Sequence, residues 1–201
     1  MCDSAVSAAA SLLPHRDDER TVRAITDVLA RFGTGALRFA SEHSIRIVPL
    51  SIAQRYACAS GALRRLGIDV DAWPVPPAGL FVVEERTVYL RSASPMTVAH
   101  EFGHALDCAL GGGVYRSGYD LRIRAAFNAA RSFVTPYAAS GLDEYFAESM
   151  RAYAGVNDSH SLWPKATRER LALVDPAMFG YLSELFQSVF CMHETGERST
   201  P

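Results

Sequence analysis

The chain has 201 residues, a length that suits one domain, and it contains 49% hydrophobic and 21% charged residues, as soluble globular proteins do. Its 20 basic and 22 acidic residues give a net charge of −2, which offers no reason to expect a nucleic-acid partner or binding to a membrane surface. No stretch approaches the roughly 20 apolar residues of a membrane span. We therefore expect no nucleic-acid or membrane partner. We also expect the protein to be a monomer.

The chain reads as one domain with two appendages. We expect residues 1–20 to form a loose leader, residues 21–190 a single domain, and residues 191–201 a polar tail. The start lacks the basic region and long apolar core of a secretion signal. The protein is thus expected in the cytoplasm of the producing cell, or delivered as an effector without a cleaved signal.

The cysteines favour reduced thiols over disulfides. They are scattered and form no CxxC pair, which argues against a structural zinc knuckle: Cys2, Cys58, Cys108 and Cys191.

The first elements alternate between helical and strand patterns. Apolar residues at helical spacing in 19–32 predict an amphipathic helix, which we expect Gly33 and Gly35 to stop. The segment SIRIVPL at 44–50 alternates and predicts a short strand.

A helix and a hairpin are expected next. Residues 51–66 favour a helix with Leu63 and Leu66 facing inward. A Pro-rich loop at 71–79 then leads to alternating apolar residues at 79–91, which predict a hairpin.

Helices dominate the rest of the chain. Ser94 and Pro95 are a typical N-cap and first helical residue, and we expect their helix to end at Gly111. Further helices are expected at 121–134, with Leu121 buried, and at 142–154, 165–174 and 176–190. The fold class predicted is α+β: a mostly helical, zincin-like domain with a small β-sheet before the central helix.

The central helix carries the sequence HEFGH. On a helix, His100 and His104 share one face, so their imidazoles converge on one metal ion. Glu101 points about 100° around the helix from His100, within reach of a water but not of the metal. This spacing is typical of zinc hydrolases, in which glutamate is the general base. A helix with no metal is the alternative.

A catalytic zinc needs a third protein ligand. Asp107 and Cys108 lie on the same straight helix and are not expected to converge with the histidines. We expect the Asp107 carboxylate either to support a ligand or to fix the helix. We expect Cys108 to be a buried side chain. Glu144 and Glu148 lie at i and i+4 on a later helix and are the better candidates, although a solvated acidic face would read the same. His160 is the remaining histidine rival.

The segments HEFGHALD at 100–107 and PYAASGLDEYFAES at 136–149 together resemble the catalytic domain of anthrax lethal factor and the secreted Pro-Pro endopeptidases of clostridia. These are zinc metallopeptidases with a glutamate ligand on a later helix. The resemblance spans roughly residues 78–185. We expect the protein to lack the substrate-docking domains of lethal factor and the secretion signal of the Pro-Pro enzymes, so the resemblance does not identify the substrate.

The resemblance implies roles for individual residues. It implies Zn²⁺ bound by His100, His104 and Glu144, with Glu101 as the base. It also implies that Glu148 supports the site from behind a ligand, and that Tyr137 stabilises the oxyanion or assists the leaving group.

The expected function is therefore zinc-dependent hydrolysis of peptide bonds inside a protein or peptide substrate. The substrate is expected to pair with an edge strand within 79–91; the alternative is that both strands of this hairpin are interior. The alternatives are a regulatory, repressor-interacting metalloprotease and a zinc-containing binding protein without proteolysis.

Overall fold

The computed structural model describes residues 2–14, 18–51, 53–159 and 165–195. Its α-helices and strands follow the chain in this order: α1 (Cys2–Ser11), α2 (Glu19–Leu29), α3 (Gly33–Glu42), β1 (Arg46–Pro49), α4 (Tyr56–Ala59), α5 (Gly61–Leu66), β2 (Gly79–Val82), β3 (Thr87–Leu90), α6 (Pro95–Leu110), α7 (Leu121–Ala129), α8 (Leu142–Tyr153), α9 (Arg168–Val174), α10 (Pro176–Leu185) and α11 (Cys191–Thr195). Short helical turns connect them: η1 (Ala30–Phe32), η2 (Val70–Ala72), η3 (Val83–Glu85), η4 (Arg116–Gly118), η5 (Tyr137–Ala139) and the π-helical η6 (Phe186–Phe190).

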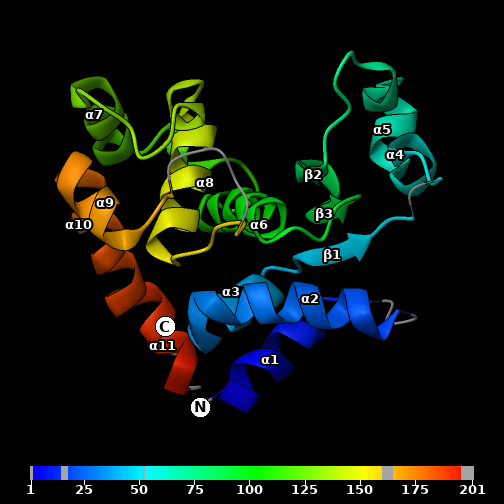
Figure 1. The fold of residues 1–201 in the computed structure, drawn as a ribbon, viewed down its shortest axis with the longest axis horizontal. Helices are drawn as coiled ribbons and strands as arrows, with labels where there is room; N and C mark the ends of the chain where they lie inside the picture. The colour runs from blue at the N-terminus through cyan, green and yellow to red at the C-terminus, as the bar shows by residue number, and fades with distance from the viewer. Residues whose placement is uncertain (1, 15–17, 52, 160–164, 196–201) are drawn as a thin grey trace.

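Helix α6 lies at the centre of the molecule (Figure 1). It contacts α8 on one side, the strands β2 and β3 on another, and α2 and α3 below. None of the described helices combines the length and apolar character needed to cross a membrane.

The sheet has three strands in the order β1-β3-β2. Central β3 pairs in parallel with β1 and antiparallel with β2, so that Val88 lies between Ile47 and Phe81. The predicted strand and hairpin are confirmed, and so is the α+β class. Because β2 is paired on only one side within the described sheet, it is an edge strand, and its neighbour is α6.

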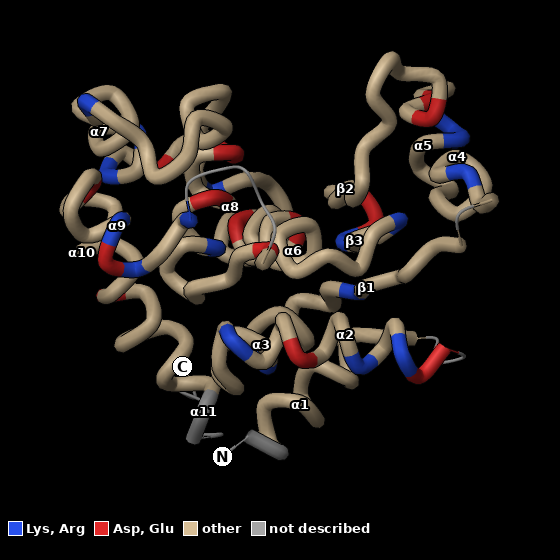
Figure 2. Tube along the Cα trace, in the orientation of Figure 1, with Lys and Arg blue, Asp and Glu red and all other residues tan. Residues whose placement is uncertain are grey.

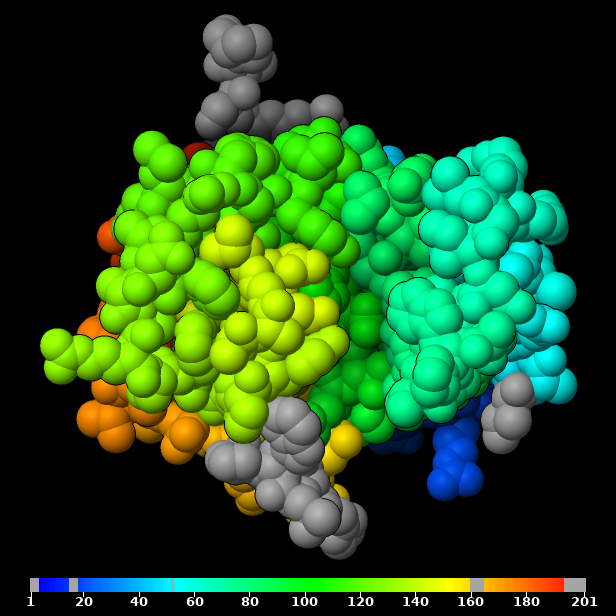
Figure 3. Space-filling model, turned by 90° about the horizontal axis from the view of Figure 1, so that it is seen from above, coloured from blue at the N-terminus to red at the C-terminus, as the bar shows by residue number. Residues whose placement is uncertain are grey.

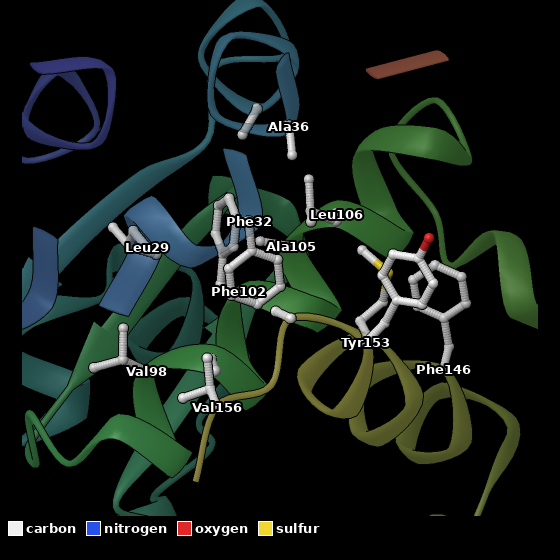
Figure 4. Close-up of a cluster of buried hydrophobic side chains, with 14 of the residues drawn as sticks. Leu29, Phe32, Ala36, Val98, Phe102, Ala105, Leu106, Phe146, Tyr153 and Val156 are labelled. Carbon is white, nitrogen blue, oxygen red and sulfur yellow. The ribbon is translucent and has the colours of Figure 1, made fainter. Parts of the chain in front are cut away.

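The face of α6 away from the histidines is buried in the main core (Figure 4). Phe102 meets Phe32 edge to face, with ring centroids 5.0 Å apart, and Leu106 lies further along the same face. An aromatic pair at this distance adds about 0.5–1.5 kcal/mol to the burial of apolar area. These core contacts fix the position of α6 independently of its other face, which carries the histidines.

A second, smaller core lies under α4 and α5, against the far face of the hairpin. Tyr56 and Leu63 pack there with Val82 and Tyr89. This core attaches the segment from 50 to 78 to the sheet.

The N-terminal segment is not the loose leader that was expected. Residues 2–11 form α1, and Ala9 and Leu12 are buried in the main core. The backbone N–H of Ile47 donates to the carbonyl of Leu12 at 2.8 Å, which ties the segment to β1. The buried positions Ala5, Ala9 and Leu12 follow helical spacing, but small alanines give a weak sequence signal.

Three further expectations about the early helices differ from the structure. Gly33, at φ +83, ends one helical stretch, but α3 begins there without an intervening loop. The helix expected at 51–66 is divided at Ser60, whose side chain caps α5 by accepting from Leu63 N–H. Leu66, expected inside, is exposed.

The C-terminal half agrees more closely with expectation. Helices α8, α9 and α10 fall where they were predicted. Helix α7 ends earlier, at Ala129, and Leu121 is exposed, because the cap at Asp120 places that residue on the outer face. In the expected tail, helix α11 covers residues 191–195 and packs on α3.

We predict that Leu12→Ala lowers the free energy of unfolding by about 2–5 kcal/mol, because a buried side chain is replaced by a cavity. Ser7→Ala, at an exposed position of helix α1, which directly precedes Leu12, is the control and should change it by less than about 0.5 kcal/mol. Urea unfolding measures both. Equal midpoints for the two variants would mean that α1 does not contribute to the core.

Candidate metal centre

Local sequence fixes α6 and the orientation of its histidines. Ser94 caps the helix by accepting from Thr97 N–H, Pro95 occupies the first turn, and the helix ends before Gly111. His100 and His104 lie one turn apart, with their rings perpendicular and 4.7 Å between centroids. Their shared face, predicted from the i, i+4 spacing, is confirmed.

Helix α8 reaches this face because the two helices pack very closely. A Cβ at Gly103 would lie 2.8 Å from the Cα of Ala147, a distance that real contacts do not show. Gly103 is therefore required by packing. The close approach brings the first turns of α8, which carry Glu144 and Glu148, against the histidines.

Three ligand-type atoms converge between the helices. Oε2 of Glu144 lies 3.0 Å from Nε2 of His100 and 3.4 Å from Nε2 of His104. The two Nε2 atoms are 3.1 Å apart. Among the described residues, these three form the one group of such side chains with the spacing of a metal site.

The triangle fits a zinc ion. Tetrahedral zinc with ligands at about 2.0–2.1 Å separates its ligand atoms by about 3.3 Å. Oε2 of Glu144 is buried and has no hydrogen-bond partner among the described residues, which is costly unless a cation accepts its charge. Two imidazole lone pairs also cannot face each other without a proton or cation between them.

The neighbours of His100 and Glu144 control the protonation of these two side chains. Burial acts to lower the pKa of His100, but the neighbouring carboxylates of Glu144 and Glu148 outweigh burial and raise the pKa to about 10. Burial likewise acts to raise the pKa of Glu144, but the two histidines hold it well below its usual range. Glu144 is therefore an anion at neutral pH, as a ligand must be.

Glu148 lies behind His100. Its Oε1 is 2.9 Å from Nδ1 of His100, on the opposite side of the ring from the triangle. Burial acts to raise the pKa of Glu148, but bonds from His100 and Arg151 bring it to about 2. Glu148 therefore contacts His100 on the side of the ring away from Glu144 and His104.

Glu101 lies between α6 and the edge strand. A Cβ at Gly79 would come within 2.6 Å of the Cγ of Glu101, so only glycine lets strand and helix approach this closely. Burial raises the pKa of Glu101, and the charge of the histidines opposes the shift. Its carboxylate is a stronger base than a solvated glutamate.

Tyr137 stands on the other side of His100. Its hydroxyl donates to Oε1 of Glu144 at 2.9 Å, and its ring centroid is 5.5 Å from that of His100. The side chain is 44% exposed, so it borders solvent and the site at once. Burial raises the pKa of Tyr137, with the nearby Glu144 anion adding to the shift, so it remains a proton donor.

Asp107 does not contact either histidine ligand through a described hydrogen bond. Both its oxygens accept from Ser117, one from the backbone N–H at 2.9 Å and one from the hydroxyl at 2.5 Å. Asp107 therefore fixes the end of α6 to the segment that follows, which is the second of the two roles expected for it. Nδ1 of His104 has no described partner.

Three neighbours of the site were not singled out from the sequence for it. The ring of Tyr115 packs 5.6 Å from that of His104, and Thr135 and Arg151 bond to Glu148. Tyr115 and Thr135 lie in loops without regular spacing. Arg151 lies on the same helix as Glu148, where its sequence position gives no sign that it is buried.

Two further residues with ligand-type side chains were named from the sequence, His160 and Cys108. His160 lies outside the described residues. Cys108 is buried with a free thiol, as expected, and Cys58 and Cys191 are free as well.

The site opens into a cleft of about 380 Å³. His100, Glu101 and Tyr137 line it together with the start of the edge strand at Ala78 and Gly79. Figure 3 shows the hollow between the lobe that carries η5 and α8 and the lobe formed by residues 55–78. The acidic residues of α6 and α8 gather at the centre of the molecule, next to this cleft (Figure 2).

A hydrogen-bond network holds the second lobe in place. The hydroxyl of Tyr56 donates to the carbonyl of Pro77 at 2.9 Å, and its backbone N–H donates to Asp71. Asp71 also pairs with Arg91, whose guanidinium lies over the Tyr56 ring. The cleft therefore has a fixed margin beside the edge strand.

The fold is similar to that of a solved structure, the Pro-Pro endopeptidase PPEP-2 from Paenibacillus alvei. The TM-score is 0.62 at 20% sequence identity, and the alignment covers 89% of this chain and 100% of the other. At this identity the likeness shows a common fold. No protein-family model matches the sequence, and no curated protein matches it.

We predict that Gly103→Ala weakens both the fold and the metal site, because the added methyl group pushes α8 away from α6. The free energy of unfolding should fall by about 1–3 kcal/mol, and zinc affinity should fall with it. Gly180→Ala is the control: it makes the same change inside α10, where no atom lies within 4 Å of the new Cβ. That variant should gain up to about 1 kcal/mol and bind zinc normally. Urea unfolding and zinc titration measure the two effects.

Proposed function

We propose that the protein is a zinc-dependent endopeptidase. The observation that carries the proposal is the triangle of His100, His104 and Glu144, with Glu101 beside it in an open cleft. The fold shared with a Pro-Pro endopeptidase supports it, and so does the sequence resemblance to that group and to lethal factor.

A zinc ion held by the triangle would supply Lewis acidity, which polarises a peptide carbonyl and lowers the pKa of water. Glu101 takes a proton from the attacking water as the new C–O bond forms, and returns it to the amine as the C–N bond breaks. Burial supports this role because it strengthens the basicity of the carboxylate.

Tyr137 supplies a hydrogen bond to the developing oxyanion. Its hydroxyl donates to Glu144 in the structure, and its partial exposure lets it exchange that acceptor for a substrate oxygen in the cleft. A phenol with a raised pKa donates but does not lose its proton at neutral pH.

The substrate is proposed to be an extended segment of a protein or peptide. It would add to the free side of β2, whose first residue, Gly79, lines the cleft. An extended chain on this strand passes directly over Glu101.

We predict that Glu101→Gln retains zinc but lowers turnover by at least about 100-fold, because the amide cannot accept the proton. Glu84→Gln, at an exposed position of η3, is the matched control and should leave turnover unchanged. The assay is a peptide-library digest that includes Pro-Pro sequences, run with and without a chelator and after zinc is restored. Zinc-loaded wild-type protein that cleaves nothing would favour the binding-protein alternative, and turnover in Glu101→Gln would exclude this glutamate as the base.

We predict that Tyr137→Phe lowers kcat by about 100-fold, because a donor to the oxyanion is lost, while the protein still binds zinc, because the three proposed ligands are intact. Tyr119→Phe, which removes a hydroxyl from an exposed loop tyrosine, is the control. Steady-state kinetics on the best peptide from the digest give kcat. An unchanged kcat in Tyr137→Phe would return this residue to a packing role.

A further inference from the structure

The guanidinium of Arg151 is buried directly behind the proposed metal site. Only 1% of its side chain is exposed, although arginine is almost never buried unless it is paired. It forms a planar, two-point contact with Glu148: Nε donates to Oε1 at 3.0 Å and Nη2 donates to Oε2 at 2.8 Å. A buried pair of this kind gives little net stability but fixes geometry when all its bonds are made.

The other hydrogen bonds of the Glu148 carboxylate are with residues beside the proposed metal site. Besides the two bonds from Arg151, its Oε1 faces Nδ1 of His100 at 2.9 Å and its Oε2 accepts from the hydroxyl of Thr135 at 2.5 Å. Four donors fill the positions of one carboxylate. The carboxylate therefore cannot rotate without breaking several bonds.

This arrangement selects one tautomer of His100. A carboxylate accepts hydrogen bonds only, so Nδ1 of His100 keeps its proton, and Nε2 is the nitrogen left to give its lone pair to a cation beside Glu144 and His104. We propose that Arg151 is a positioning residue for the metal site, which holds Glu148 so that His100 presents Nε2 to the cation. The inference rests on the proposed zinc site.

A second branch of the network reaches the turn that carries Tyr137. The hydroxyl of Thr135, which donates to Glu148, also accepts from the backbone N–H of Ala138 at 3.3 Å. Ala138 follows Tyr137 in η5. One carboxylate thereby places both a ligand and the proposed oxyanion donor.

Arg151 is itself fixed from the other side. Its Nη1 donates to the carbonyl of Val156 at 3.0 Å and to Oδ1 of Asn157 at 3.2 Å. Asn157 is held in turn by two hydrogen bonds with the backbone of Ala166. The guanidinium is thus immobilised by the loop after α8 independently of Glu148.

The test compares zinc dissociation constants by chelator competition. Arg151→Met should weaken zinc binding by about 10–100-fold, and Arg151→Lys, which keeps the charge but loses the planar fork, should fall between it and wild type. Arg168→Met is the control, because Arg168 stacks on Tyr153 of the same helix without touching Glu148. It should bind zinc as wild type does.

A double-mutant cycle keeps the test valid if the unpaired Glu148 charge prevents Arg151→Met from folding. In Glu148→Gln the buried anion is gone, and adding Arg151→Met to that variant should change the zinc dissociation constant by less than about twofold. Equal losses in both backgrounds would mean that Arg151 acts through the fold and not through Glu148, and would overturn the inference.

The ring nitrogens of His100 give a readout that a purely structural role would not move. Nitrogen NMR of the zinc-loaded protein should show His100 protonated at Nδ1 in wild type, and Arg151→Lys should shift or broaden that signal. Wild-type protein that binds no zinc would overturn the proposed function and the inference together. A different result would overturn the inference alone. In that case the wild-type protein binds zinc and turns over substrate, and both Arg151 variants keep the wild-type His100 signal and zinc affinity.

Discussion

The contact between α6 and α8 at Gly103 and Ala147 is the constraint on which the site depends. Each helix alone presents only part of the candidate metal centre: α6 carries the two imidazoles and α8 carries the carboxylates. At the spacing of ordinary helix packing, about 8–10 Å between axes, side chains fill the space between helices. With only a hydrogen atom on Gly103, the helices approach until Glu144 reaches the two histidines. The opposite face of α6, packed against Phe32, keeps it from moving away.

The site also shows how buried charge is arranged by its surroundings. Glu101, Glu144 and Glu148 lie within one small region and would repel one another if left unpaired. Glu148 is neutralised permanently by Arg151, whereas Glu144 faces the histidines and Glu101 faces the cleft beside β2. Three residues of one chemical type thus have three environments, and the proposed roles of support, ligand and base follow from them.

The sequence predicted those parts of the protein that depend on local spacing. The cap at Ser94, the shared face of His100 and His104, the hairpin and the later helices each follow from patterns a few residues long. It failed where packing at a distance decides the outcome. Helix α1 was missed because alanines carry little periodic contrast, and Leu66 was placed inside although its side chain is exposed. Asp107 reads equally well as a support for a ligand or as a helix anchor, and only its bonds to Ser117 separate the two.

What the sequence by itself determined is the chemical capacity of α6, because a spacing of four residues fixes two side chains on one helical face without help from the rest of the chain. Residue types near 144 could be matched to a known pattern, but their distance from the histidines could not be derived. Only the tertiary structure decided that Glu144 completes the triangle, that Glu148 turns toward Nδ1 of His100, and that Arg151 is buried behind both. The contacts of Glu144 and Glu148 with the histidines join residues forty or more positions apart, and their geometry is set by how closely two helices pack.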